Sequence, residues 1–203
     1  LLLASITGQN IKNILPETTE GIEKNVLAEL FFKYALNCDE EGDLENAVKY
    51  YKKCVETSQD PKINQYLSST LTNLATIFDE NGKSDTATKY LQESLRLDEI
   101  TQNYNGIYVS TMKLAEINLN KAPQKTLEYL KRAKVCAEEL KEPFYIASTD
   151  VSIGDFYYNR KDYPNALKHY KLAYTLAFDN FTKENIEKIK IRINDIKKVY
   201  NEK

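Results

Sequence analysis

The side chains that most often carry out chemistry in proteins are few and scattered in this sequence. His169 is the only histidine, and neither a second metal ligand nor an orienting group stands at a spacing that would make it a general base. Cys38, Cys54 and Cys136 form no close pair and have no histidine spaced to activate a thiol. The sequence also lacks a glycine-rich phosphate loop, a paired-cysteine metal spacing and a nucleophile elbow. We therefore predict no catalytic residue, no metal site and no cofactor, and we expect a protein that is not an enzyme.

Charge and composition narrow the class of protein further. The 28 basic and 30 acidic residues leave a net charge of -2, whereas nucleic-acid binders carry a basic excess. No apolar stretch approaches the about 20 residues that span a bilayer. Sparse, unpaired cysteines favour a reducing compartment, so we expect a cytoplasmic protein with no nucleic-acid partner and no membrane contact from this segment. The apolar start, Leu1 to Ile6, has no initiator Met, which predicts a piece of a longer protein and leaves an upstream targeting or membrane segment open.

Small side chains return at a nearly constant interval along the chain. The first column is Ala35, Ala75, Ala115 and Gly154, with steps of 40, 40 and 39 residues. The second column is Ala47, Ala87, Thr126 and Ala166, the third is Cys54, Ser94, Ala133 and Ala173, and the large residues Tyr51, Leu91, Leu130 and Tyr170 stand between them. Small residues let two helices meet in a tight antiparallel hairpin and let the next hairpin lean against it. The pattern predicts stacked helical hairpins, because a single hairpin cannot bury both of its faces.

Turn residues set the expected bounds of the helices. Gly42 and Gly82 suit left-handed helix ends, and Pro61 and Pro143 mark breaks between hairpins. The predicted helices are 22–41, 43–58, 62–81, 84–101, 104–120, 123–141, 143–160, 163–179 and 183–201. We expect one all-α domain, 1–203, with repeats at 22–58, 62–101, 104–141 and 143–179 and with residues 1–21 as the remnant of a preceding repeat.

The last predicted helix, 183–201, continues the register of a first helix. Ile193 lies 40 residues after Ile153, but Asn194 replaces the small residue. Its apolar stripe is Ile186, Ile189, Ile193, Ile196 and Tyr200. We expect a capping helix, because the open end of a solenoid needs a cover. Its basic residues are expected on the solvent side, although they could also meet an acidic surface: Lys183, Lys188, Lys190, Arg192, Lys197 and Lys198.

These columns resemble those of the tetratricopeptide repeat family, in its longer variety of about forty residues. The second repeat carries the fullest match, at Leu71, Leu74, Ala75, Phe78, Gly82, Ala87, Leu91 and Ser94. The resemblance covers about residues 24–180 and implies a right-handed superhelical solenoid of antiparallel hairpins. It also implies a scaffold whose concave groove, lined by the first helices, binds a protein or peptide. The resemblance implies this mode of binding and leaves the target open.

The family pattern further implies which residues face the groove. The implied residues are Glu29, Lys33, Leu36, Glu40, Asn73, Thr76, Asp79, Glu80, Lys113, Glu116, Ser152 and Asp155. Acids outnumber lysines among them, which favours a basic or mixed-charge peptide, although solvated acids near turns explain the same excess. A clamp for a terminal carboxylate, as in chaperone-binding members, is not expected, because Phe32 and Leu36 replace its cation and amide.

Two other functions stay open at this stage. The first is a peptide-sensing regulatory domain of a larger signalling or transcription-regulating protein, which an attached effector domain would reveal. The second is an oligomerisation module in which array ends or tyrosine-rich faces pair, and light scattering would separate it from a monomeric scaffold. The oligomeric state itself is left undetermined by the sequence.

Overall fold

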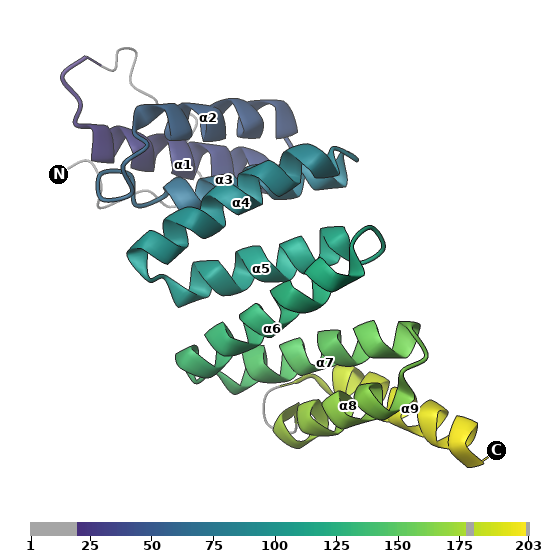
Figure 1. Ribbon diagram of the computed structural model, residues 1–203. Coiled ribbons are helices and arrows are strands. Elements are labelled where there is room, and N and C mark those ends of the chain that lie inside the picture. The colour runs from purple at the N-terminus through teal and green to yellow at the C-terminus, as the bar shows by residue number, and fades with distance from the viewer. Residues whose placement is uncertain (1–19, 178–180, 202–203) are drawn as a thin grey trace. The chain divides into compact units, whose positions relative to one another are not determined.

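The computed structural model describes residues 20–177 and 181–201, and all regular secondary structure in this part of the chain is α-helical (Figure 1). This confirms the predicted all-α class. The chain forms two compact units, the first ending at Gln102 and the second beginning at Asn103. The predicted remnant of an earlier repeat falls mostly on residues 1–19, outside the described residues. Whether the two units act as one domain stays a prediction.

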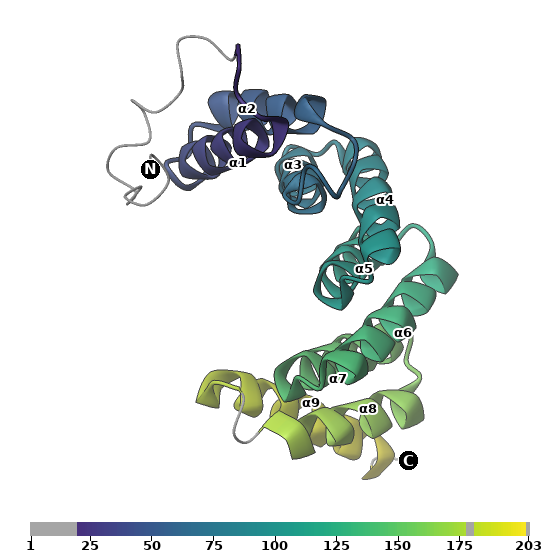
Figure 2. The same ribbon diagram turned by 90° about the vertical axis from the view of Figure 1, so that its left-hand side faces the viewer.

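The first unit contains two antiparallel helical hairpins. They are formed by α1 (Lys24–Glu40) with α2 (Leu44–Thr57) and by α3 (Leu67–Glu80) with α4 (Ser84–Thr101), and α2 packs on α3 (Figure 2). Gly42 and Gly82 have φ of 79° and 72° at the two tight turns, the left-handed conformation that favours glycine. The amides of the residues that follow, Asp43 and Lys83, donate to carbonyls of the preceding helices at 2.8 Å.

The start of α3 differs from the prediction, which began this helix at residue 62. Asn64 is buried, and its Nδ2 donates to the carbonyl oxygen of Cys54 at 2.8 Å and to that of Ser58 at 3.3 Å. The Asp60 side chain accepts from the backbone amide of Lys62 at 2.9 Å. Such side-chain bonds replace helical backbone bonds, so the chain turns here and the helix begins only at Leu67.

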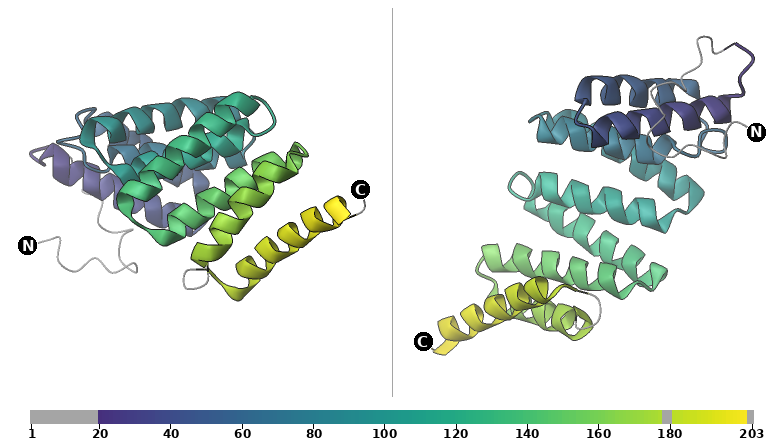
Figure 3. Two further views of the ribbon diagram at one scale, coloured as in Figure 1. Left: turned by 60° about the horizontal axis from the view of Figure 1, so that its bottom comes forward. Right: turned by 180° about the vertical axis from the view of Figure 1, so that it is seen from behind.

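The second unit contains two further hairpins and a final single helix. The hairpins are α5 (Tyr104–Asn118) with α6 (Pro123–Leu140) and α7 (Pro143–Asn159) with α8 (Tyr163–Ala177). The final helix, α9 (Lys183–Asn201), lies against α8, and α6 packs on α7 (Figure 3). Ile189, Ile193 and Ile196 are buried in a cluster with Tyr170 and Ala173. The predicted apolar stripe of α9 is therefore confirmed for these residues, while the side chain of its last member, Tyr200, lies outside the described residues.

The small residues of the first column are buried, as close packing of the helices requires. The first three members of the first column, Ala35, Ala75 and Ala115, are at most 2% exposed. The fourth, Gly154, faces the ring of Tyr170 so closely that an added Cβ would lie 2.7 Å from its Cδ1 and Cε1 atoms. Tyr170 is itself fully buried. Close helix packing in this repeat therefore depends on the absence of a side chain at Gly154.

Candidate functional site

The second unit has a cavity of about 370 Å³ between α5, α6 and α7, which we call the α5–α7 cavity. Four residues of the predicted groove line it: Lys113, Glu116, Ser152 and Asp155. Met112 and Phe156 contribute apolar surface to the same cavity. The structure therefore brings together all the predicted groove residues that belong to this unit, two from α5 and two from α7.

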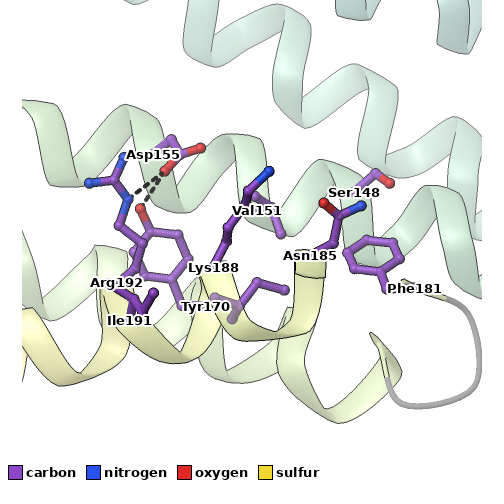
Figure 4. Close-up of a pocket in the computed structure, with 10 residues that line it drawn as sticks. Ser148, Val151, Asp155, Tyr170, Phe181, Asn185, Lys188, Ile191 and Arg192 are labelled. Atoms are coloured by element: carbon purple, nitrogen blue, oxygen red, sulfur yellow. Dashed lines mark hydrogen bonds and ion pairs between the residues drawn. The ribbon is translucent and has the colours of Figure 1, made fainter. Parts of the chain in front are cut away.

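A second cavity of about 450 Å³, the α7–α9 cavity, lies between α7, α8 and α9 in the same unit (Figure 4). Asp155 lines this cavity as well as the α5–α7 cavity. Its apolar lining comes from Val151, Ile191 and Phe181, together with the buried Ile189. The α7–α9 cavity thus continues the first-helix surface from α7 to α9.

The contribution of α9 to this surface was not among the predictions from the sequence. Lys188 and Arg192 are exposed, as expected for the basic side of α9, and they also line the α7–α9 cavity. The signal was present in the repeat register, because the two residues lie 40 positions after Ser148 and Ser152 of α7. The expected capping helix therefore also presents the groove positions of a first helix.

Asp155 is held by a residue from each of two neighbouring helices. The Tyr170 hydroxyl of α8 donates to Asp155 Oδ1 at 2.6 Å, and Arg192 Nε of α9 lies 3.7 Å from the same oxygen. The Arg192 guanidinium lies 4.7 Å from the centre of the Tyr158 ring, within cation–π range. Burial, with the hydrogen bond to Asp155 and its negative charge, raises the pKa of Tyr170. The tyrosine therefore remains a donor, and Asp155 keeps a fixed orientation.

A similar arrangement occurs in the first unit. Tyr51, in the same repeat column as Tyr170, donates to Asp39 Oδ2 at 3.3 Å and accepts from Asn73 Nδ2 at 2.9 Å. Burial raises the pKa of Tyr51, and the negative charge of Asp39 adds to this effect. Asn73, a predicted groove residue on α3, thus bonds to a tyrosine that comes from the preceding hairpin.

The other predicted groove residues of the first unit lie on α1 and α3. Lys33 Nζ lies 2.6 Å from Glu29 Oε1 one turn away, and this hydrogen bond raises the pKa of Lys33. Leu36, Thr76 and Asp79 are partly buried, whereas Glu40 and Glu80 are exposed. A shared binding role for these residues stays a prediction.

Comparison with known proteins adds the family. Residues 28–61 and 68–101 match the family model of the tetratricopeptide repeat, and the two matches begin 40 residues apart. The chain contains tetratricopeptide repeats. The matched repeats include most of the hairpin α1–α2 and all of the hairpin α3–α4 except Leu67. The 40-residue offset agrees with the longer repeat variety that the small-residue columns predicted.

Solved structures show the same fold over most of the chain. BtubC (BKLC) from P. vanneervenii is 18% identical and gives a TM-score of 0.72, with 88% of this chain and 74% of that chain covered. The MamA protein is also 18% identical and gives a TM-score of 0.55, with 86% of this chain and 88% of that chain covered. None of the curated proteins compared with the sequence matches it. The fold of the tetratricopeptide repeats thus extends over both units.

The single histidine has a partner that was not expected from the sequence. His169 Nδ1 lies 2.8 Å from Asp150 Oδ1, and Lys134 Nζ lies 2.7 Å from the same oxygen. The His169 ring also stacks on Tyr157, with centroids 5.9 Å apart. Asp150 is buried, so this cluster joins α6, α7 and α8 in the interior of the second unit. The contact was missed because it joins neighbouring helices at no motif-like spacing.

The three cysteine thiols lie in the interior of the helical packing. Cys38, Cys54 and Cys136 are all buried, and burial raises the pKa of the Cys54 and Cys136 thiols. Among residues 20–177 and 181–201, no group of three or more histidine, cysteine or acidic side chains is placed to hold a metal ion. None of the helices within the same residues is long and apolar enough to span a bilayer.

Proposed function

We propose that this chain is a scaffold that binds a protein or peptide segment on the first-helix faces of its repeats. Tetratricopeptide repeats generally mediate contacts between proteins, and the chain contains such repeats. The observation that carries the proposal is the α5–α7 cavity, where Lys113, Glu116, Ser152 and Asp155 meet around one opening. These residues come from two successive first helices, which is the surface that the family pattern implies.

The chemistry of the two cavities suits a peptide better than a small polar metabolite. Their volumes of about 370 and 450 Å³ fall within the roughly 300–1,000 Å³ of small-molecule pockets and are large enough to hold one side chain of a protein segment. Apolar side chains such as Met112, Phe156 and Val151 can bury an anchor residue, while charged residues at the edges orient it. Charges of both signs line the cavities, which favours a mixed-charge segment.

Site-specific photo-crosslinking tests this proposal. A photoreactive amino acid is placed at Met112 or Ser152, which line the α5–α7 cavity, and at the exposed second-helix residues Glu128 and Lys168 as matched controls. Each variant is expressed in the cells that naturally make this protein and is irradiated there. The crosslinked adducts are then identified by mass spectrometry. We expect one partner protein to crosslink at the two cavity positions and not at the controls.

Two outcomes would contradict the scaffold proposal. Equal crosslinking at cavity and control positions would mean that the first-helix faces have no special role. An adduct formed only with a second copy of the chain would instead favour the oligomerisation alternative, and light scattering on the purified chain would then show a dimer or larger assembly.

A further inference from the structure

We propose that the α7–α9 cavity is a subsite for an acidic side chain of the bound segment, and that Lys188 and Arg192 bind its carboxylate. This inference rests on the proposed function, because it names the chemistry that one end of the binding surface selects. The acid-rich residues of the predicted groove favoured a basic or mixed-charge peptide, whereas this subsite selects an acidic side chain. The two cations both come from α9, whose basic residues were expected on the solvent side or against an acidic surface.

Arg192 is oriented for this role by contacts that leave most of its donors available. Its contact with Asp155 uses Nε at 3.7 Å, so the two terminal nitrogens lie outside that contact (Figure 4). The Tyr158 ring lies 4.7 Å from the guanidinium carbon and restricts the plane of the group. A guanidinium is planar and binds carboxylates through two parallel hydrogen bonds. Arg192 can therefore bind a carboxylate with little loss of side-chain freedom.

Lys188 lies one helical turn before Arg192 and lines the same cavity. Figure 4 shows its side chain extending beside Val151 of α7. Its ammonium is 2.7 Å from Glu184, but the two side chains are 66% and 76% exposed. Exposed pairs of this kind contribute little to stability, so Lys188 can exchange Glu184 for a ligand carboxylate at small cost.

The charge of the cavity favours an anion. The charged residues that line it are Lys188, Arg192 and Asp155, and the last already accepts a hydrogen bond from the buried Tyr170. Two cations and one acid therefore give the lining of the cavity a net positive charge. Apolar surface stands beside them, including Ile191, which is 52% exposed. The fitting occupant is an Asp or Glu that neighbours a large apolar residue in a protein segment.

The test measures how tightly three pools of synthetic peptides bind to the full chain. The pools have one fixed position beside an apolar residue, occupied by Glu, by Gln or by Lys, and binding is followed by fluorescence polarisation. We expect the Glu pool to bind about tenfold more tightly than the Gln pool, as one charge-assisted hydrogen bond allows, and the Lys pool to bind most weakly. Added salt should reduce this preference, because exposed charges are screened.

Paired variants assign the preference to the proposed residues. The double substitution Lys188→Gln with Arg192→Gln should abolish the Glu preference, so that the Glu and Gln pools bind with equal affinity. The control Lys197→Gln with Lys198→Gln removes the same charge from exposed positions of α9 that do not line the cavity, and it should keep the preference. In the Lys188→Gln background, Arg192→Lys should keep more of the Glu preference than Arg192→Gln does, because it keeps the positive charge.

The outcomes separate this inference from the function on which it rests. Equal binding of the Glu and Gln pools, or an equal loss in both double variants, overturns the acidic subsite while peptide binding stands. Failure of every pool to bind, together with no cavity-specific crosslink at Met112 or Ser152, overturns the scaffold proposal and the subsite with it.

Discussion

A single added methyl group at Gly154 provides a direct test of the close helix packing in the fourth repeat. The Cβ of a Gly154→Ala variant would lie 2.7 Å from Tyr170 Cδ1 and Cε1 and 3.2 Å from Cζ, where carbon atoms prefer roughly 3.5–4.0 Å. The ring has little room to shift, because Tyr170 is fully buried and its hydroxyl is bonded to Asp155 at 2.6 Å.

Two opposing effects set the magnitude. Replacing glycine by alanine inside a helix stabilises the helix by about 1 kcal/mol. Forcing an extra methyl group into a packed core costs about 1–3 kcal/mol, and a shift of the Tyr170 ring would also weaken its bond to a charged acceptor, which contributes about 1.5–3 kcal/mol in general. Because Asp155 is 45% exposed, we count only a part of that bond. We expect a net loss of about 1–2 kcal/mol in the free energy of unfolding.

Urea denaturation followed by circular dichroism measures this loss, and a double-mutant cycle isolates its cause. In a Tyr170→Leu background the aromatic ring is absent, so Gly154→Ala should become neutral or stabilise the chain by up to about 1 kcal/mol. If Gly154→Ala stabilises the parent chain, or costs the same in both backgrounds, the close approach of Gly154 and Tyr170 does not govern packing in this repeat.

Three further predictions follow from the described contacts. Tyr51→Phe removes the hydroxyl between Asp39 and Asn73 and should lower the free energy of unfolding in urea by about 1 kcal/mol. Asp150→Ala removes the buried acceptor of His169 and should lower the free energy of unfolding by about 2 kcal/mol in the same assay. An unchanged free energy of unfolding would contradict the inference that Asp150 holds neighbouring helices together. The buried cysteines, two of which have raised pKa values, should react with iodoacetamide much more slowly in the native than in the urea-unfolded chain, as mass spectrometry would show.

The helices could be predicted from the sequence because small side chains recur wherever two backbones must meet. Ala75 and Ala115 carry that information locally, since a small residue is needed whatever the remaining sequence does. The late start of α3 could not be read in this way. It depends on Asn64 reaching the carbonyl of Cys54 on the preceding helix, which is a contact between elements rather than a local preference.

The candidate site was predictable only in part, for a related reason. The 40-residue register places Lys113 and Ser152 on successive first helices, and the structure brings both to the α5–α7 cavity. The same register extends to Arg192, but the expectation of a cap hid its groove position. The contact of His169 with Asp150 has no counterpart in the repeat columns and becomes visible only when α7 and α8 are packed together.

The predicted groove residues divide into two kinds once their contacts are known. Asn73 and Asp155 bond to buried tyrosine hydroxyls, so replacing either one disturbs the packing of neighbouring helices as well as the surface. Lys188 and Arg192 are substantially exposed, and the described contacts that they make are with other exposed or partly exposed groups. A change in ligand binding after substitution of the first kind therefore reports on folding and recognition together. Substitutions of the second kind separate the two, because stability can be held constant while the charge offered to a ligand changes.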